Sequence, residues 1–259
     1  MSTQRLSTIS KLSGLIALSM WMPLVTAAQI TPAAQKRAQI LLERAAKTMG
    51  GDRLDQLASI QVIGTWPSRS GPLSKVAVYL FPDRMRRDLM TPMGWMNTVV
   101  VTPAECFAIG EGERIRVMKP QDRLPAEQHF QRQPVWLLRA RHAPGFLAYV
   151  SGTENKEQVA VENVAVEFAG LHVTLGIDPA SGRVLRLAYR ESTGPNTFGA
   201  YEEFFSDFRV VDGIEFPFHV AGTVEGQPSP GLGWEVQSVR VNAAVDRKLF
   251  EKPSTAGQP

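Results

Sequence analysis

Short segments of alternating apolar and polar residues make up most of this 259-residue chain, and a turn signal ends each of them. Alternation with a period of two indicates β-strands that bury one face. Most connections are short, such as the turn at 178–182 with its Asp, Pro and Gly, so neighbouring strands must pair as hairpins in an antiparallel sheet. The expected strands are 60–66, 75–80, 85–91, 95–101, 105–109, 114–118, 159–168, 171–177, 183–190, 201–210, 214–223 and 233–242.

Two regions of the chain follow a helical pattern instead. Thr31 is a good N-cap and Pro32 a good first helical residue, and apolar residues then recur at helical spacing up to the Gly50-Gly51 stop. The segment Pro125–His142 predicts two short helical pieces, because Pro134 is excluded from a helix interior but can open a second helix.

A sheet of about a dozen strands curls strongly. Two helical regions are too few to cover both of its faces, so either loops cover the remainder or the concave face is an apolar groove for a ligand. The expected fold is therefore mainly β: a strongly curved antiparallel sheet, or an incomplete β-barrel, with a helical lid over its open side. The sequence shows no internal repeat and no long linker, which favours one domain over residues 28–259.

The first 27 residues have the pattern of a signal peptide. Arg5 and Lys11 precede an apolar stretch from Leu12 to Leu24, and the small residues around Ala27 fit a cleavage site, with Ala28 as a close alternative. The apolar stretch is far shorter than the ~20 residues that span a bilayer. We therefore expect an exported, periplasmic protein.

Charge and cysteine content exclude several classes of protein. Removing Arg5 and Lys11 leaves 26 basic residues against 25 acidic ones, so the mature chain lacks the positive charge of a nucleic-acid binder. Cys106 is the single cysteine and lies in an apolar strand, where a small buried side chain is expected. With one cysteine and four scattered histidines, neither a disulfide framework nor a metal site is expected.

No catalytic motif stands out. The sequence has no nucleophile elbow, phosphate-binding loop or HExxH zinc motif, and its four histidines fall on separate expected elements. Glu202, Glu203 and Asp207 could serve as acid and base in a hydrolase, but solvated strand charges explain them as well. We therefore expect a protein that is not an enzyme and that needs no cofactor.

The apolar residues are more distinctive than the polar ones. Met85, Met90, Met93 and Met96 fall within twelve residues, beside Trp95. Methionine is flexible and polarisable, and it is frequent where one surface must fit varied apolar partners. These residues indicate either an ordinary core or the lining of an apolar cavity.

Several motifs occur in an order typical of one family. They are Met49-Gly50-Gly51 after the first helix, the strand–Pro–strand segment 79–86, the hairpin 177–184, the segment 205–217 and the ending 242–253. In these motifs the chain resembles the bacterial lipoprotein carriers of the LolA/LolB type, and more closely the outer membrane lipoprotein-sorting proteins. The resemblance extends over about residues 36–253.

The resemblance implies an incomplete antiparallel β-barrel whose open side is covered by helices and which encloses an apolar cavity. It also implies that the protein shields acyl chains from water, which needs no covalent chemistry because each buried CH₂ contributes about 0.8 kcal/mol. In the carriers, an Arg immediately before the Pro of the first hairpin is tied to lid closure and cargo release. Here that position is Phe81, so neither that lid mechanism nor a lipoprotein cargo follows.

These observations lead to a hypothesis: a periplasmic, non-enzymatic carrier or sensor of lipids or lipidated proteins. Its partners would be acyl chains or a lipoprotein and possible donor and acceptor proteins at the two membranes, and we expect a monomer. The lid contacts would be Leu41 and Trp136. The residues expected to line the cavity are Trp66, Val78, Leu80, Leu89, Met96, Val100 and Phe107.

Two other functions fit the same sequence. One is an exported interaction module with a solid core, which would bind another protein through a sheet edge. The other is a secreted hydrolase in which Glu203, Asp207 or a histidine acts as acid or base. The hydrolase predicts a cleft where titratable groups with displaced pKa values converge.

Overall fold

The computed structural model describes residues 30–68, 71–94, 96–156, 159–194 and 197–253. The expected signal peptide, residues 1–27, and Trp95 lie outside the described residues. The expected fold class is confirmed: the strands form one large antiparallel sheet of 14 strands that does not close. The order across the sheet is β6-β5-β4-β3-β2-β1-β14-β12-β11-β10-β9-β8-β7, with β13 paired to β12.

All twelve expected strands are present, with ends that differ by a few residues. Consecutive strands pair as hairpins on both sides of a central β1–β14–β12 junction, where the first strand of the chain pairs with the last. The bounds are β1 Ser59–Trp66, β2 Leu73–Leu80, β3 Arg84–Met90, β4 Met96–Val101, β5 Cys106–Ile109, β6 Ile115–Val117, β7 Leu147–Lys156, β8 Val159–Phe168, β9 Leu171–Ile177, β10 Val184–Gly194, β11 Thr197–Val211, β12 Ile214–Val224, β13 Gln227–Pro228 and β14 Trp234–Val241.

One long strand, β7, was not expected from the sequence. It forms an edge of the sheet and pairs only with β8 among the described strands. Its register shifts between Val150 and Gly152, so the alternation of apolar and polar residues changes phase within the strand. A broken alternation removes the signal by which a strand is recognised in a sequence.

The helices confirm both expected helical regions. Thr31 caps the first helix, and its side-chain oxygen accepts a hydrogen bond from the amide of Ala34 at 3.1 Å. The second region begins at Pro120, five residues earlier than expected, and Pro134 opens its second helix. The helices are α1 Pro32–Met49, α2 Asp52–Asp55, α3 Pro120–Gln131 and α4 Pro134–Arg139, with 3₁₀ turns η1 Glu111–Glu113, η2 Ala140–His142, η3 Pro230–Leu232 and η4 Arg247–Phe250.

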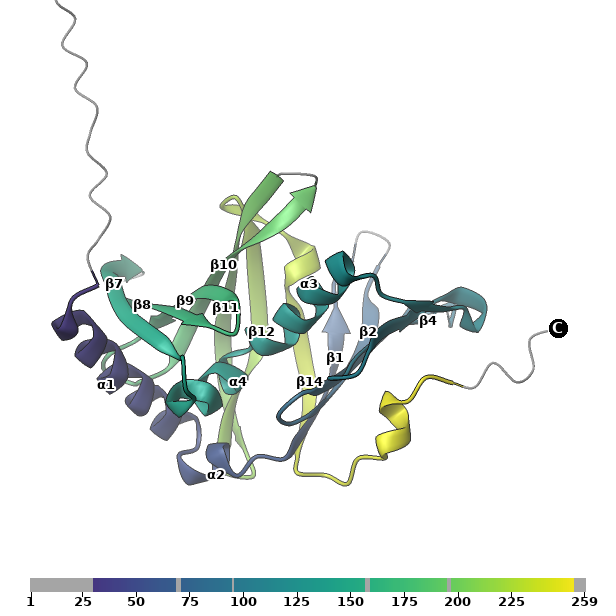
Figure 1. Cartoon of the computed structure of the whole chain (residues 1–259), viewed down its shortest axis with the longest axis horizontal. Helices are drawn as coiled ribbons and strands as arrows, with labels where there is room; N and C mark the ends of the chain where they lie inside the picture. The colour runs from purple at the N-terminus through teal and green to yellow at the C-terminus, as the bar shows by residue number, and fades with distance from the viewer. Residues whose placement is uncertain (1–29, 69–70, 95, 157–158, 195–196, 254–259) are drawn as a thin grey trace, which may run out of the picture.

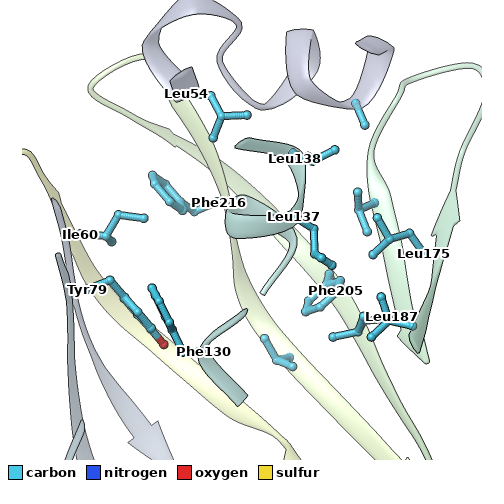
Figure 2. Packing of buried hydrophobic residues seen from close by; sticks show 14 of the residues in the cluster. Leu54, Ile60, Tyr79, Phe130, Leu137, Leu138, Leu175, Leu187, Phe205 and Phe216 are labelled. Atoms are coloured by element: carbon cyan, nitrogen blue, oxygen red, sulfur yellow. The ribbon is translucent and has the colours of Figure 1, made fainter. Parts of the chain in front are cut away.

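The helices gather on one face of the sheet. In Figure 1, α3 and α4 cross in front of the strands, and α1 lies beside β7 and β8. Between helices and sheet lies the main apolar core (Figure 2). Ile60 and Tyr79 lie on one side of it, where Tyr79 stacks on Phe130 of α3, and Leu175 and Leu187 lie on the other side, towards Leu137 of α4. The helices thus fill the space that a closed barrel would enclose.

The opposite face of the sheet holds a second core at its β2–β6 end. There Val78, Val100 and Phe107 are buried against Phe250 of η4, and Leu80 packs on the cluster. These four residues were expected on the face beneath the helices. In the structure, the adjacent residues of each strand, such as Tyr79 and Ala108, lie on the face beneath the helices. The predicted inward face is therefore wrong for β2, β4 and β5.

The reason for this difference is that both faces of these strands are apolar. Ala77, Tyr79 and Ala108 belong to the core beneath the helices, while Val78, Val100 and Phe107 belong to the core beneath η4. Because each face is covered, apolar residues do not alternate with polar ones and the sequence gives no sign of which face is inside.

Candidate functional site

The remaining expected cavity residues are spread over different surroundings. Trp66 lines a pocket beneath η3, and its indole Nε1 donates a hydrogen bond to the carbonyl of Gly231 at 3.0 Å. Leu89 is buried and shares the strand face of Arg87. Met96 belongs to β4 and pairs with Met90, but its side chain is not among those described.

Both residues expected as lid contacts lie in the main core. Leu41 of α1 is buried in the cluster, and Trp136 of α4 packs on it between the rings of Phe130 and Phe168. The Trp136 indole also donates a hydrogen bond to the carbonyl of Pro82 at 3.0 Å.

The β2–β3 turn meets α4 where the family's Arg would lie. The guanidinium of Arg139 in α4 lies over the ring of Phe81, 4.5 Å from its centre. This cation–π contact joins α4 to the β2–β3 turn.

The methionine group does not form a common surface. Met85 is fully buried in the main core, whereas Met93 is 93% exposed and Met90 is exposed. Of the two interpretations left open by the sequence, an ordinary core is confirmed for Met85, while Met90 and Met93 belong neither to the core nor to a cavity lining, and the side chain of Met96 is not among those described. They point in different directions because they lie on both faces of β3 and in the turn that follows it.

A polar cavity of about 220 Å³ lies between the sheet and the C-terminal end of α3. It is lined by residues of six strands, of η3 and of the C-terminal end of α3, and we call it the polar pocket. Its main polar and aromatic members are Trp66, Lys75, Tyr79, Arg87, His129, Arg132, Tyr189, Glu203 and Trp234.

Lys75 of β2 is the most perturbed cation of the polar pocket. Its Nζ lies 3.5 Å from the centre of the Trp234 ring, a cation–π contact. Burial is the main cause that lowers the pKa of Lys75 to about 7, Arg87 lowers it further, and Glu203 opposes the shift. No described residue accepts a hydrogen bond or forms an ion pair with this ammonium group.

Arg87 of β3 also lacks an anionic partner among the described residues. Its Nε is buried and makes no hydrogen bond there. Burial lowers the pKa of Arg87, Tyr79 opposes this, and Arg132 adds to it. Arg132, at the end of α3, is 5% exposed; it forms an ion pair with Glu191 at 3.2 Å and lies over the ring of Tyr189 at 3.9 Å.

The only carboxylate among the described lining residues is Glu203 of β11, which is 8% exposed. It accepts a hydrogen bond from the Tyr189 hydroxyl at 3.0 Å. Burial raises the pKa of Glu203, although Arg132, Tyr189 and Lys75 oppose the shift. The interpretation of Glu203 as a solvated strand charge is thus wrong, whereas Asp207 is exposed and pairs with Arg209 at 2.6 Å.

His129 of α3 completes the polar pocket. Burial, with the positive charges of Arg132, Arg87 and Lys75, holds the pKa of His129 well below its usual value. Its imidazole is therefore neutral at pH 7, with Nδ1 placed 3.2 Å from the Arg132 guanidinium.

A wider groove of about 750 Å³ runs between α3 and the strands β8–β11, and we call it the α3 groove. Two of its side chains are large, apolar and exposed: Leu124 of α3 (52%) and Phe198 of β11 (59%). Arg132 and Tyr189 line both the α3 groove and the polar pocket, so the two spaces adjoin. The other apolar lining residues of the α3 groove are Tyr149, Ala165, Val166, Leu171, Val173, Ala188, Ala200 and Tyr201.

Sequence reasoning missed the polar pocket, because recognising it requires knowing which strand face lies beneath the helices, and the alternation in β2 does not show this. Lys75 is in phase with Ala77 and Tyr79, and Arg87 is in phase with Met85 and Leu89. A charged residue on the buried parity of a strand indicates a charge that points inward. Arg116, by contrast, is exposed and pairs with Asp122 at 3.3 Å.

Two further searches gave negative results. The described residues contain no group of three or more His, Cys, Asp or Glu that could hold a metal ion. In the described part of the chain, no helix has both the length and the apolar character needed to cross a bilayer.

The fold is shared with solved structures, although no family model and no curated protein matches the sequence. An outer membrane lipoprotein-sorting protein domain from Vibrio parahaemolyticus has a TM-score of 0.53 at 9% identity, over 84% of this chain and 97% of its own. A DUF1329 family protein from Desulfovibrio piger has a TM-score of 0.55 at 12% identity, over 85% and 99%. A LolA superfamily protein from Nitrosomonas europaea has a TM-score of 0.53 at 10% identity, over 83% and 97%.

These likenesses confirm the expected resemblance at the level of the fold. The chain has a LolA-like fold along most of its length.

Proposed function

We propose that this protein is a non-enzymatic periplasmic carrier or sensor of lipids or lipidated proteins, formed by one domain after removal of a signal peptide. The observation that carries the proposal is the α3 groove, with exposed Leu124 and Phe198 among its lining residues. Exposed apolar side chains in a concave site are costly in water and favourable against an acyl chain. The LolA-like fold, shared with a lipoprotein-sorting domain, supports the same class of cargo.

The element proposed to cover the α3 groove is α3 itself, which has little buried surface. Phe130 is the single buried residue of α3, whereas five residues of α1 are buried. Few buried apolar contacts mean a low free energy of local opening. We therefore propose α3, rather than α1, as the element that moves when an acyl chain enters.

Uptake of acyl probes by the delipidated protein tests this function. The probes are a fluorescent fatty acid and its uncharged methyl ester. We expect saturable binding of at least one of them, and Leu124→Asp or Phe198→Asp should lower the affinity on the order of 10-fold, because a charge would meet the acyl chain. Val210→Asp is the matched control, since Val210 is also exposed (68%) but lies outside the α3 groove. Absence of binding, or an equal effect of all three substitutions, would contradict the proposal.

A hydrolase is the second candidate, because the polar pocket brings together titratable groups with displaced pKa values, as that hypothesis expected. Glu203 and neutral His129 are the groups that could act as acid and base. Release of p-nitrophenol from a medium-chain ester, abolished by Glu203→Gln, would favour the hydrolase. If the wild type hydrolyses the ester no faster than Glu203→Gln does, the carrier remains the better explanation.

A further inference from the structure

We propose that the polar pocket binds the anionic phosphodiester headgroup of a lipid whose acyl chains lie in the α3 groove. This inference rests on the proposed function and names the class of cargo. Two cations carry it: the described residues leave Lys75 Nζ without a hydrogen-bond acceptor or an ion pair, and they leave Arg87 Nε buried and without a hydrogen bond. Both side chains are partly buried and neither has an anionic partner in the described chain, so a cavity that brings them together favours an anion.

The charges of the polar pocket do not balance without a ligand. Lys75, Arg87 and Arg132 bring three cations. Glu203 and Glu191, which pairs with Arg132 from the rim, are the facing carboxylates in the described chain. One positive charge remains when both carboxylates are ionised, and the excess grows when Glu203 takes up a proton. A single anionic group therefore completes the balance.

The arrangement of the cations suits a phosphodiester. Lys75 and Arg87 reach the cavity from one face of the adjacent strands β2 and β3, and Arg132 reaches it from the end of α3, so N–H groups line two sides of the cavity. A tetrahedral phosphate presents oxygens in several directions, and guanidinium groups bind such oxygens with two parallel hydrogen bonds. The cavity of about 220 Å³ is much larger than one water molecule needs (~30 Å³), and it has room for such a group.

The position of the polar pocket links the headgroup to the acyl chains. Arg132 and Tyr189 form the boundary between the polar pocket and the α3 groove. A headgroup beside Arg132 would thus leave its glycerol carbons at the mouth of the α3 groove. Glu203 does not oppose this, because burial favours its protonated form, which can donate a hydrogen bond to a phosphate oxygen.

Calorimetric titration of the delipidated protein at pH 6.5 tests the headgroup site. The probes are dihexanoyl phosphatidylglycerol, uncharged dihexanoylglycerol with the same chains, and glycerophosphoglycerol, which has the same phosphodiester without chains. We expect the phospholipid to bind at least about 10-fold more tightly than either of the others, since charge-assisted hydrogen bonds and acyl burial both contribute. Equal affinity for the charged and uncharged lipids would overturn the headgroup site and leave the proposed function standing. Equal affinity for the phospholipid and glycerophosphoglycerol would mean that the acyl chains contribute nothing, and it would overturn a lipid as the source of the phosphodiester. Binding of no lipid would overturn both proposals.

Two variants assign the effect to the polar pocket. Arg87→Gln and Lys75→Met should each weaken phosphatidylglycerol binding about 10-fold or more and leave dihexanoylglycerol binding within about 2-fold. Arg240→Gln is the control, because Arg240 is exposed on β14 and does not line the polar pocket. Lys75→Met should also raise the melting temperature of the ligand-free protein, a sign opposite to that of structural damage. Unchanged phosphatidylglycerol affinity in Lys75→Met would overturn the proposal even if Arg87→Gln failed to fold.

Discussion

At the scale of one residue, the surroundings of Lys75 determine its pKa. Trp234 on β14, Arg87 on β3, Glu203 on β11 and the α3 residues His129 and Arg132 surround its ammonium group. Burial removes water from the charge, the cations repel it, and Glu203 attracts it. The pKa of about 7 follows from these opposing effects, and it makes Lys75 a group that titrates near neutral pH.

This pKa predicts a rise in stability with pH. Between pH 7 and 10 the unfolded chain binds a proton at Lys75 that the folded protein has largely released, so the free energy of unfolding increases with pH. One such group contributes up to about 1.4 kcal/mol per pH unit. Urea unfolding at pH 7.5 and 9.5 should show this increase in the wild type and lose most of it in Lys75→Met. The same pH dependence in both proteins would contradict the assigned burial of Lys75.

At the scale of elements, η4 covers the back of the sheet. Its Phe250 is 3% exposed and packs on Val78, Val100 and Phe107. The Asp246 carboxylate accepts a hydrogen bond from the amide of Lys248 at 3.0 Å and so begins the turn. The C-terminal segment thus gives the β2–β6 hairpins a second covered face, while the helices cover the first.

Removal of the Phe250 ring should therefore affect stability and leave lipid binding unchanged. Phe250→Ala should lower the free energy of unfolding by about 3–5 kcal/mol, because it leaves a cavity between η4 and the sheet. Leu249→Ala, at a 37% exposed neighbour, should cost less than about 1 kcal/mol. Chemical denaturation measures both, and probe affinity per folded molecule should match the wild type. A loss of affinity in folded Phe250→Ala would show that the back face takes part in binding.

The elements also show what the sequence could predict. A strand with one solvated face, such as β9, alternates clearly over its first residues, and the predicted bounds of β8 and β9 match the structure. Strands covered on both faces could be found but not oriented, which explains why Val100 and Phe107 were expected on the wrong face. The polar pocket depends on side chains from β2, β3, β11 and α3, and the spatial order of these elements is not readable from local patterns.

The whole molecule is an open sheet whose interior is only partly filled. The main core packs α1 and α4 firmly, while α3 has the polar pocket at its C-terminal end and the α3 groove along its side. Figure 1 shows α3 crossing the middle of the sheet, where it is placed to cover a ligand. At about 10% identity the shared LolA-like fold does not fix what such a space binds, so its function must be argued from the lining residues of this chain.

Mass spectrometry of organic extracts from the purified mature protein, expressed with export, tests the carrier or sensor account most directly. A mock purification is the control for adventitious lipid. The account predicts stoichiometric lipid, and the proposed headgroup site further predicts that anionic phospholipid is enriched over neutral lipid. A clean extract, together with no uptake of the fluorescent fatty acid or its methyl ester by the delipidated protein, would contradict the account and favour an interaction module.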